Sequence, residues 1–147
     1  MTAHLLTWNP RRYPIPDDVY DARRRQVEGG RPLVGRWSTG QSRRVRQGDT
    51  VYWLRQGPDR RGLIGSGVAV SDVFQEAHYD RPGRTANYVE HSFDVVLAVD
   101  ERFETEHLLL AVPRVPWDYL QGSGYRVPEH SEELLAQLWA EHLTELG

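Results

Sequence analysis

Short runs of hydrophobic residues between polar turns dominate this chain, and they predict strands rather than helices over most of its length. Residues 4–8 form a β-prone run that ends in a turn. Residues 50–55 and 62–70 are two such runs on either side of a polar turn, the pattern of a β-hairpin. The apolar run within residues 91–99 predicts a buried strand, and residues 108–112 are a further apolar stretch.

Two segments have the pattern of a helix. Residues 17–28 begin with acidic residues, continue with arginines and are followed by two glycines, which predicts a short polar helix. Residues 131–146 place leucines and Trp139 at spacings of three, four and seven, which predicts an amphipathic helix. Ser131 is the expected N-cap of this helix, because its hydroxyl can accept a hydrogen bond from a free backbone N–H.

The polar residues 75–87 predict a mobile loop that connects two strands. Within the run 62–70, Gly62, Gly65 and Gly67 leave little side chain in the way of another backbone or a ligand. Bulges are the favoured interpretation of these glycines, ahead of ligand contacts.

Several strands with an early helix and a closing helix predict an α+β fold, built on a curved sheet or small barrel. The 147 residues suit a single domain, 1–147, with one core. No apolar run approaches the roughly 20 residues that span a bilayer, and the first ten residues lack the pattern of a signal peptide, so we expect a cytoplasmic protein.

The formal net charge of -3 conceals two halves of opposite charge. The first 61 residues contain 13 arginines and 6 acidic residues, +7, whereas the rest contain 5 and 15, -10. We therefore expect any nucleic-acid surface in the first part. All 18 basic residues are arginine, and arginine suits contacts with phosphate. The codon bias of a GC-rich genome also explains the absence of lysine, and we favour this interpretation.

Residue types that support catalysis are sparse. The absence of cysteine excludes disulfides and thiolate chemistry, and the absence of lysine excludes the lysine of a phosphate-binding loop. The six histidines have no metal-ligand spacing, and Glu101, Glu104 and Glu106 have the pattern of a solvated loop. We expect no catalytic residues, no metal and no cofactor.

Aromatic residues close to arginines are the more informative feature. Trp8, Trp37 and Trp53 each lie within a few residues of arginines, an arrangement in which bases stack on rings and guanidinium groups hold phosphates. Trp53 and Trp139 lie in periodic apolar segments, which predicts core positions. Trp37 lies among glycines and hydroxyl residues, and its composition leaves core packing and ligand contact equally open.

Five segments, taken in order, resemble the EVE domain of the PUA-like superfamily, which is related to YTH and ASCH domains. These segments are Thr-Trp-Asn-Pro at 7–10, Trp-Ser-Thr-Gly at 37–40, and residues 48–57, 61–67 and 117–124. The resemblance covers nearly the whole chain. It implies a twisted, barrel-like sheet flanked by helices, with a concave face that holds nucleic acid.

In the related YTH domains an aromatic pocket takes up one methylated base, and their Gly-x-Trp-Ser segment is similar to residues 35–38 here. The resemblance thus makes Trp37 the expected pocket wall and places Ser38 near the base edge. The candidates for a second wall are Trp8, Tyr88 and Trp117. Asn9 and Ser123 join Ser38 as candidates for polar contacts to the base. The expected phosphate contacts are Arg12, Arg43, Arg44, Arg46, Arg60 and Arg61.

Bacterial EVE-like domains occur fused to restriction nucleases, where the family role is recognition of 5-methylcytosine or 5-hydroxymethylcytosine. This chain has no nuclease half, so we expect a non-enzymatic module whose partner is modified double-stranded DNA and whose target base is flipped. Three alternatives stay open: an RNA-binding PUA-like domain, a small ASCH-like nuclease, and a protein-interaction adaptor that uses the acidic half.

Overall fold

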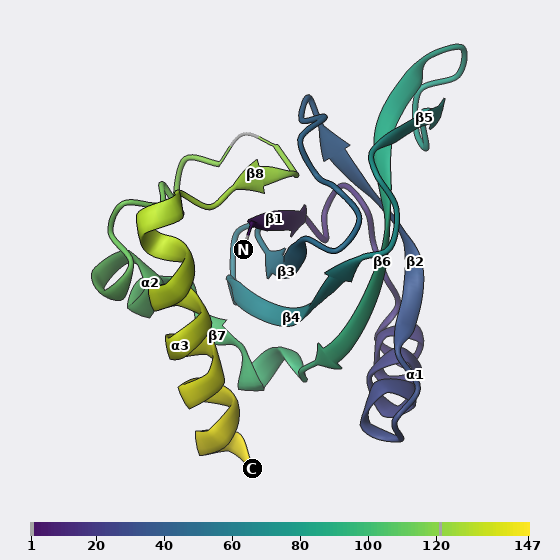
Figure 1. The fold of residues 1–147 in the computed structure, drawn as a ribbon. Coiled ribbons are helices and arrows are strands. Elements are labelled where there is room, and N and C mark those ends of the chain that lie inside the picture. The colour runs from purple at the N-terminus through teal and green to yellow at the C-terminus, as the bar shows by residue number, and fades with distance from the viewer. Residues whose placement is uncertain (1, 121) are drawn as a thin grey trace.

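The computed structural model describes residues 2–120 and 122–147, and its centre is a strongly curled sheet that forms a half-barrel (Figure 1). The strands are β1 (Ala3–Trp8), β2 (Leu33–Gly40), β3 (Thr50–Arg55), β4 (Gly62–Ala69), β5 (Phe74–Ala77), β6 (Thr85–Val96), β7 (Phe103–Glu104) and β8 (Tyr125–Arg126). The helices are α1 (Asp17–Glu28), α2 (Thr105–Ala111) and α3 (Glu129–Leu146), with a 3-10 turn, η1, at Val99–Glu101. The predicted α+β class is confirmed.

The strand order is β2-β6-β4-β3-β1-β8, with β5 paired to β6 and β7 paired to β4. β1 and β3 are parallel, and the other pairs among the described strands are antiparallel. The predicted β3–β4 hairpin is confirmed. Because the sheet curls, α1 lies against its β2–β6 side while α2 and α3 lie on the opposite side (Figure 1).

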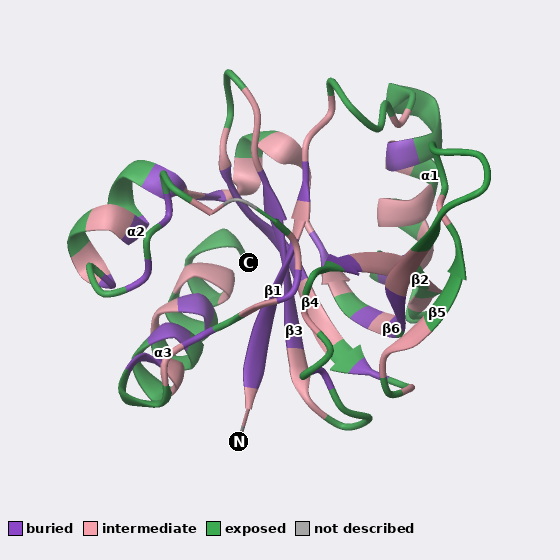
Figure 2. Cartoon of the chain, turned by 90° about the horizontal axis from the view of Figure 1, so that it is seen from above, coloured by how far each residue is buried: buried purple, intermediate pink, exposed green. Residues whose placement is uncertain are grey.

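The central strands are buried on both faces, so consecutive side chains enter two separate cores (Figure 2). Leu5 and Tyr52 enter the core beneath α2 and α3, where Trp139 of α3 packs. Leu6 and Trp53 enter the core beneath α1. Trp53 and Trp139 are thus core residues, as predicted.

The two main helices differ in how well their ends were predicted. α1 has the predicted bounds and ends at Glu28; the next residue, Gly29, is its C-cap, and the N–H of Gly29 donates to the carbonyl of Arg25 over 2.9 Å. α3 begins at Glu129, two residues earlier than predicted, directly after Pro128. The N-cap prediction for Ser131 is wrong: this residue is buried in the first turn and its backbone N–H donates to the carbonyl of Pro128.

Residues 75–87 are not the predicted loop, because β5 and the start of β6 form an antiparallel hairpin there. Gln75 pairs with Asn87 and Ala77 with Thr85, and only residues 78–84 connect the strands. The side chains of β5 are mostly exposed, so the hairpin depends on main-chain pairing and has no hydrophobic alternation to reveal it.

The stretch from 101 to 106 is also structured rather than a solvated loop. Glu101 ends η1, and its carboxylate accepts the N–H of Ala98 over 3.2 Å. Glu104 lies in β7, and Glu106 is exposed in the first turn of α2. The three carboxylates therefore serve separate elements.

Gly67 permits the tight curl of the sheet. A Cβ atom at this position would lie 1.9 Å from the carbonyl oxygen of Ser92, and the register of β4 against β6 shifts at this point. This glycine marks a bulge with close strand contact, which confirms the favoured interpretation for Gly67.

Among the described residues, no helix combines the length and the apolar character needed to cross a bilayer.

Candidate functional site

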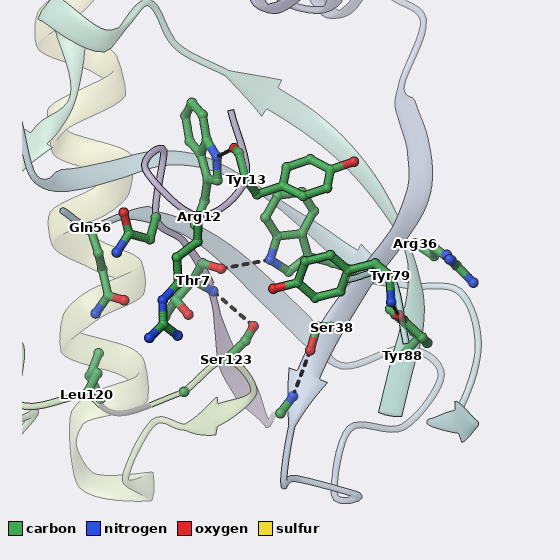
Figure 3. A pocket seen from close by; sticks show the side chains of 15 residues that line it. Thr7, Arg12, Tyr13, Arg36, Ser38, Gln56, Tyr79, Tyr88, Leu120 and Ser123 are labelled. Atoms are coloured by element: carbon green, nitrogen blue, oxygen red, sulfur yellow. Dashed lines mark hydrogen bonds between the residues drawn. The ribbon is translucent and has the colours of Figure 1, made fainter. Parts of the chain in front are cut away.

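A cavity of about 550 Å³ opens at one edge of the half-barrel. Its walls come from five segments: the end of β1 with the following turn, β2, Gln56 directly after β3, the β5–β6 hairpin, and the chain just before β8. Figure 3 shows the side chains that line it.

Two long-range hydrogen bonds hold these segments together. The indole Nε1 of Trp37 donates to the carbonyl of Thr7 over 2.8 Å, which ties β2 to β1. The N–H of Thr7 donates to the hydroxyl of Ser123 over 3.0 Å, which ties β1 to the segment before β8. The two bonds fix three walls of the cavity relative to one another (Figure 3).

Hydrogen bonds within the turn after β1 fix its backbone. The carbonyl of Asn9 accepts the N–H groups of Arg12 and Tyr13, each over 3.0 Å, and its side-chain oxygen accepts the N–H of Arg11. The indole Nε1 of Trp8 donates to the carbonyl of Tyr13 over 2.7 Å. Because the backbone is fixed at both ends of the turn, Arg12 and Tyr13 are presented to the cavity together.

Three aromatic rings offer accessible surface in the cavity. Tyr13 and Tyr79 are 45% and 46% exposed, and Trp37 is half-buried. The ring of Tyr13 meets that of Trp37 at a centroid distance of 5.7 Å and an angle of 70°, and that of Tyr79 at 5.8 Å and 76°. The rings thus form a corner, in which a planar ligand can stack on one face and bring its edge to another.

The ring of Trp8 is buried and already stacked. It lies 5.8 Å from Tyr20 and 5.5 Å from Trp53, both in near-parallel arrangement. Trp8 therefore forms the floor of the cavity and positions the turn that carries Tyr13.

Tyr88 is similarly occupied. Its hydroxyl donates to the carbonyl of Ala77 over 3.0 Å and accepts the N–H of Tyr79 over 2.9 Å. The guanidinium of Arg36 covers its ring at 4.3 Å from the centroid. Tyr88 thus supports Tyr79 rather than presenting a free face.

Polar groups with unused capacity also line the cavity. The hydroxyl of Ser38 accepts the N–H of Gly40, and that of Ser123 accepts the N–H of Thr7, so each keeps its proton and one lone pair. The side-chain amide of Gln56 makes no hydrogen bond to any residue that the structure describes. These groups can both donate to and accept from a ligand edge.

The electrostatics of the cavity favour an anion. Within the described part of the chain, its lining includes two arginines and no carboxylate. Arg36 is paired with Glu76 of β5, whereas the side chain of Arg12 makes no ion pair or hydrogen bond to a described residue. Arg12 therefore supplies an uncompensated positive charge.

Six of the seven residues predicted for a base pocket lie around this one cavity: Trp8, Asn9, Trp37, Ser38, Tyr88 and Ser123. The prediction for Trp117 is wrong. This residue is 2% exposed in the core beneath α2 and α3, and its indole donates to the carbonyl of Val112 over 2.9 Å.

The six arginines predicted to contact phosphate do not form one group. Arg12 lines the cavity. Arg43, Arg44 and Arg46 are exposed on residues 41–49, the connection that leaves the cavity after Gly40.

Arg60 and Arg61 lie elsewhere. Arg60 lines a second cavity on the other side of Trp8. Arg61 forms ion pairs with Asp118 at 2.8 Å and Glu106 at 3.9 Å, so its charge is already compensated. The structure does not bring these two arginines to the candidate site.

Sequence reasoning missed Tyr13, Tyr79 and Gln56. Tyr13 directly follows Arg11 and Arg12, and Tyr79 is an aromatic residue in a polar hairpin connection. An aromatic side chain in a polar segment has no core to enter, which is the pattern that could have identified both tyrosines.

The buried histidines lie in the sheet and not in the cavity. Burial lowers the pKa of His91 to about 4. Burial also lowers the pKa of His4, although its Nε2 lies 3.0 Å from a carboxylate oxygen of Asp49, which opposes the shift. No group of three His, Asp or Glu side chains suited to a metal occurs in residues 2–120 and 122–147.

A scan against protein-family models and a search of curated proteins found no match to this sequence. Solved structures are similar in fold. A hypothetical protein from Leishmania major has a TM-score of 0.71 at 14% identity, over 100% of this chain and 98% of that one. A protein from Pseudomonas syringae has a TM-score of 0.64 at 14% identity, over 95% and 99%.

Human THYN1, solved in complex with DNA that contains 5-methylcytosine, has a TM-score of 0.59 at 12% identity, over 94% of this chain and 97% of that one. At these identities the likeness establishes a common fold, the curled α+β half-barrel, and membership of the PUA-like superfamily stays a prediction. Membership of the EVE family itself stays a prediction.

Proposed function

We propose that this chain is a binding module that takes one modified base, flipped out of DNA, into the cavity lined by Tyr13, Trp37 and Tyr79. The bases proposed are 5-methylcytosine and 5-hydroxymethylcytosine. One observation carries the proposal: three accessible rings and several free polar groups line the same cavity. No carboxylate occurs among the described residues of that lining. The shared fold with THYN1, whose structure contains 5-methylcytosine DNA, supports the choice of base.

The energetics of the aromatic corner are compatible with base flipping. Extruding a base from a duplex costs a few kcal/mol. Stacking on an aromatic side chain contributes roughly 1–3 kcal/mol per base. Tyr13 and Tyr79 can contribute this without rearrangement, because both rings are already exposed to the cavity.

Selection of the modified base rests on shape. Burying one methyl group contributes about 0.8 kcal/mol, a factor of roughly four in affinity. The hydroxyls of Ser38 and Ser123 can add hydrogen bonds to the base edge, since each keeps a free proton. We expect a modest preference over plain cytosine, larger where the methyl group fills the corner of rings.

Phosphate contacts outside the cavity are assigned to Arg43, Arg44 and Arg46, which are exposed on one connection beside it. Each neutralised phosphate makes the logarithm of the binding constant fall by about 0.9 per decade of salt. Replacing one of these arginines should lower that slope.

The proposal includes no catalytic step. Its support is the lining of the cavity, which within the described residues contains neither a carboxylate nor a histidine. An ASCH-like nuclease would cleave labelled DNA or RNA, and this is tested with the same oligonucleotides.

The test is fluorescence anisotropy with matched duplexes that carry cytosine, 5-methylcytosine, 5-hydroxymethylcytosine or N6-methyladenine, and with single-stranded RNA that carries the same bases. The variant Tyr79→Ala removes an exposed ring of the corner, and Tyr119→Ala is the control, because Tyr119 is 81% exposed and does not line the cavity. We expect one modified duplex to bind best and Tyr79→Ala to lower its affinity roughly fivefold or more. Tyr119→Ala should have no effect.

Two results would contradict the proposal. Equal binding to all duplexes, unchanged by Tyr79→Ala, would remove the base pocket. Tighter binding to single-stranded RNA, with the same dependence on Tyr79, would replace DNA by RNA as the partner.

A further inference from the structure

The cavity has two chemically different ends (Figure 3). Tyr13 and Tyr79 lie at one end, and Arg12 extends toward the other, where Gln56 and Leu120 lie. A volume of about 550 Å³ falls in the range of roughly 300–1,000 Å³ that holds a drug-sized molecule, so a base occupies only part of it. The end beside Arg12 is left for a second, polar group of the ligand.

The positive charge of Arg12 at this end favours binding of an anion. The guanidinium of Arg12 has no partner among the described residues, and no carboxylate of that part of the chain lines the cavity. The second cavity, of about 580 Å³, is different, because its two arginines face three aspartates of the same lining. A free guanidinium binds phosphate through two parallel hydrogen bonds.

The turn after β1 holds the backbones of Arg12 and Tyr13 together, with the guanidinium directed away from the ring toward the other end of the cavity (Figure 3). The carbonyl of Asn9 accepts the N–H groups of both residues, so ring and guanidinium come from one rigid turn. In a nucleotide, base and phosphate are separated by a single sugar. A base stacked on the aromatic corner therefore carries its own phosphate toward Arg12. A turn that is ordered in advance loses little entropy when the ligand binds.

We infer that the cavity binds a whole nucleotide, with the base at the aromatic corner and the phosphate of the same nucleotide on Arg12. The side-chain amides of Gln56 and Asn9 are further donors to that phosphate. The inference rests on the proposed function and deepens it. It implies that a free modified nucleoside monophosphate binds the cavity without any neighbouring nucleotides.

The test is isothermal titration calorimetry with 5-methyl-2′-deoxycytidine, its 5′- and 3′-monophosphates, and the same three compounds of plain deoxycytidine. The full chain is compared with Arg12→Gln and with the control Arg11→Gln, which removes a neighbouring exposed arginine that does not line the cavity. We expect one monophosphate to bind about tenfold tighter than its nucleoside, as for a hydrogen bond to a charged group. Arg12→Gln should abolish this difference, and Arg11→Gln should preserve it.

The outcomes separate the inference from the proposed function. If nucleosides and monophosphates bind equally, or if tighter binding of a monophosphate survives Arg12→Gln, the inference is overturned while the base pocket stands. If no compound binds, the inference is also overturned. If the monophosphates bind in an Arg12-dependent way but the methyl group makes no difference, the inference holds and recognition of a modified base fails.

Discussion

Acid should destabilise this protein through His91, and the effect can be isolated with one substitution. The side chain is 4% exposed in β6 and lies parallel to the ring of Phe93 at 4.0 Å. Burial lowers the pKa of His91 to about 4; the positive charge of Arg23 adds to this, and the backbone of Leu33 opposes it. The folded protein therefore holds this histidine neutral.

The magnitude follows from the two pKa values. In the unfolded chain the pKa of His91 returns to its ordinary value of 6.5, so between pH 6.5 and 4 the unfolded state binds more protons than the folded state. The contribution to stability is complete above pH 6.5 and is lost as the pH falls toward 4. The loss is about 1.4 kcal/mol per pH unit, or roughly 2 kcal/mol at pH 5 and roughly 3 kcal/mol at pH 4.

The assay is urea denaturation at half-unit pH steps from 4 to 7.5, with His91→Phe as the test variant and His107→Phe as a control at an exposed position. His91→Phe keeps a ring against Phe93 but cannot titrate. We expect its free energy of unfolding to fall less between pH 7 and pH 5 than that of the unchanged protein, by roughly 2 kcal/mol. Carboxylates and His4 titrate in both proteins and cancel in this difference. Identical pH profiles for the two proteins would refute the reasoning.

Two further substitutions test the curl of the sheet and the corrected position of a tryptophan. Gly67→Ala places a Cβ atom 1.9 Å from the carbonyl oxygen of Ser92. Urea denaturation should therefore show that its free energy of unfolding is lower by more than about 2 kcal/mol. The control Gly122→Ala should change this free energy little, because a Cβ atom there has no neighbour within 4 Å. Trp117→Ala should cost roughly 3–5 kcal/mol of stability while the folded fraction binds nucleic acid as before. Weaker nucleic-acid binding by the folded fraction of Trp117→Ala would contradict a purely structural role for Trp117 in the core.

The elements that the sequence predicted well are those with local patterns. α1 has an acidic start and a glycine stop twelve residues later, and β3 and β4 are apolar runs on either side of a polar turn. β2 and β5 had no such pattern, because only Thr39 among their residues is buried and both strands pair with β6. Main-chain pairing does not require particular side chains, so it leaves little trace in the composition of either strand.

The site was predictable only in part. The residues around Trp37 were found because their order resembles a known family. Tyr13 and Tyr79 meet across 66 residues of chain, a contact that no local spacing encodes. Trp117 shows the converse error, since a tryptophan near glycines and polar residues can belong to a core as well as to a pocket. Burial is a property of the assembled fold and not of the neighbouring residues.

The hydrogen bond between Thr7 and Ser123 joins residues 116 positions apart, and β1 pairs with β8 over a similar separation. Closing so long a loop costs conformational entropy before these contacts can stabilise the fold. During synthesis, β1 cannot form these contacts until the segment around Ser123 has been made. The cavity therefore acquires its last wall only after residue 123 of the 147 has been synthesised.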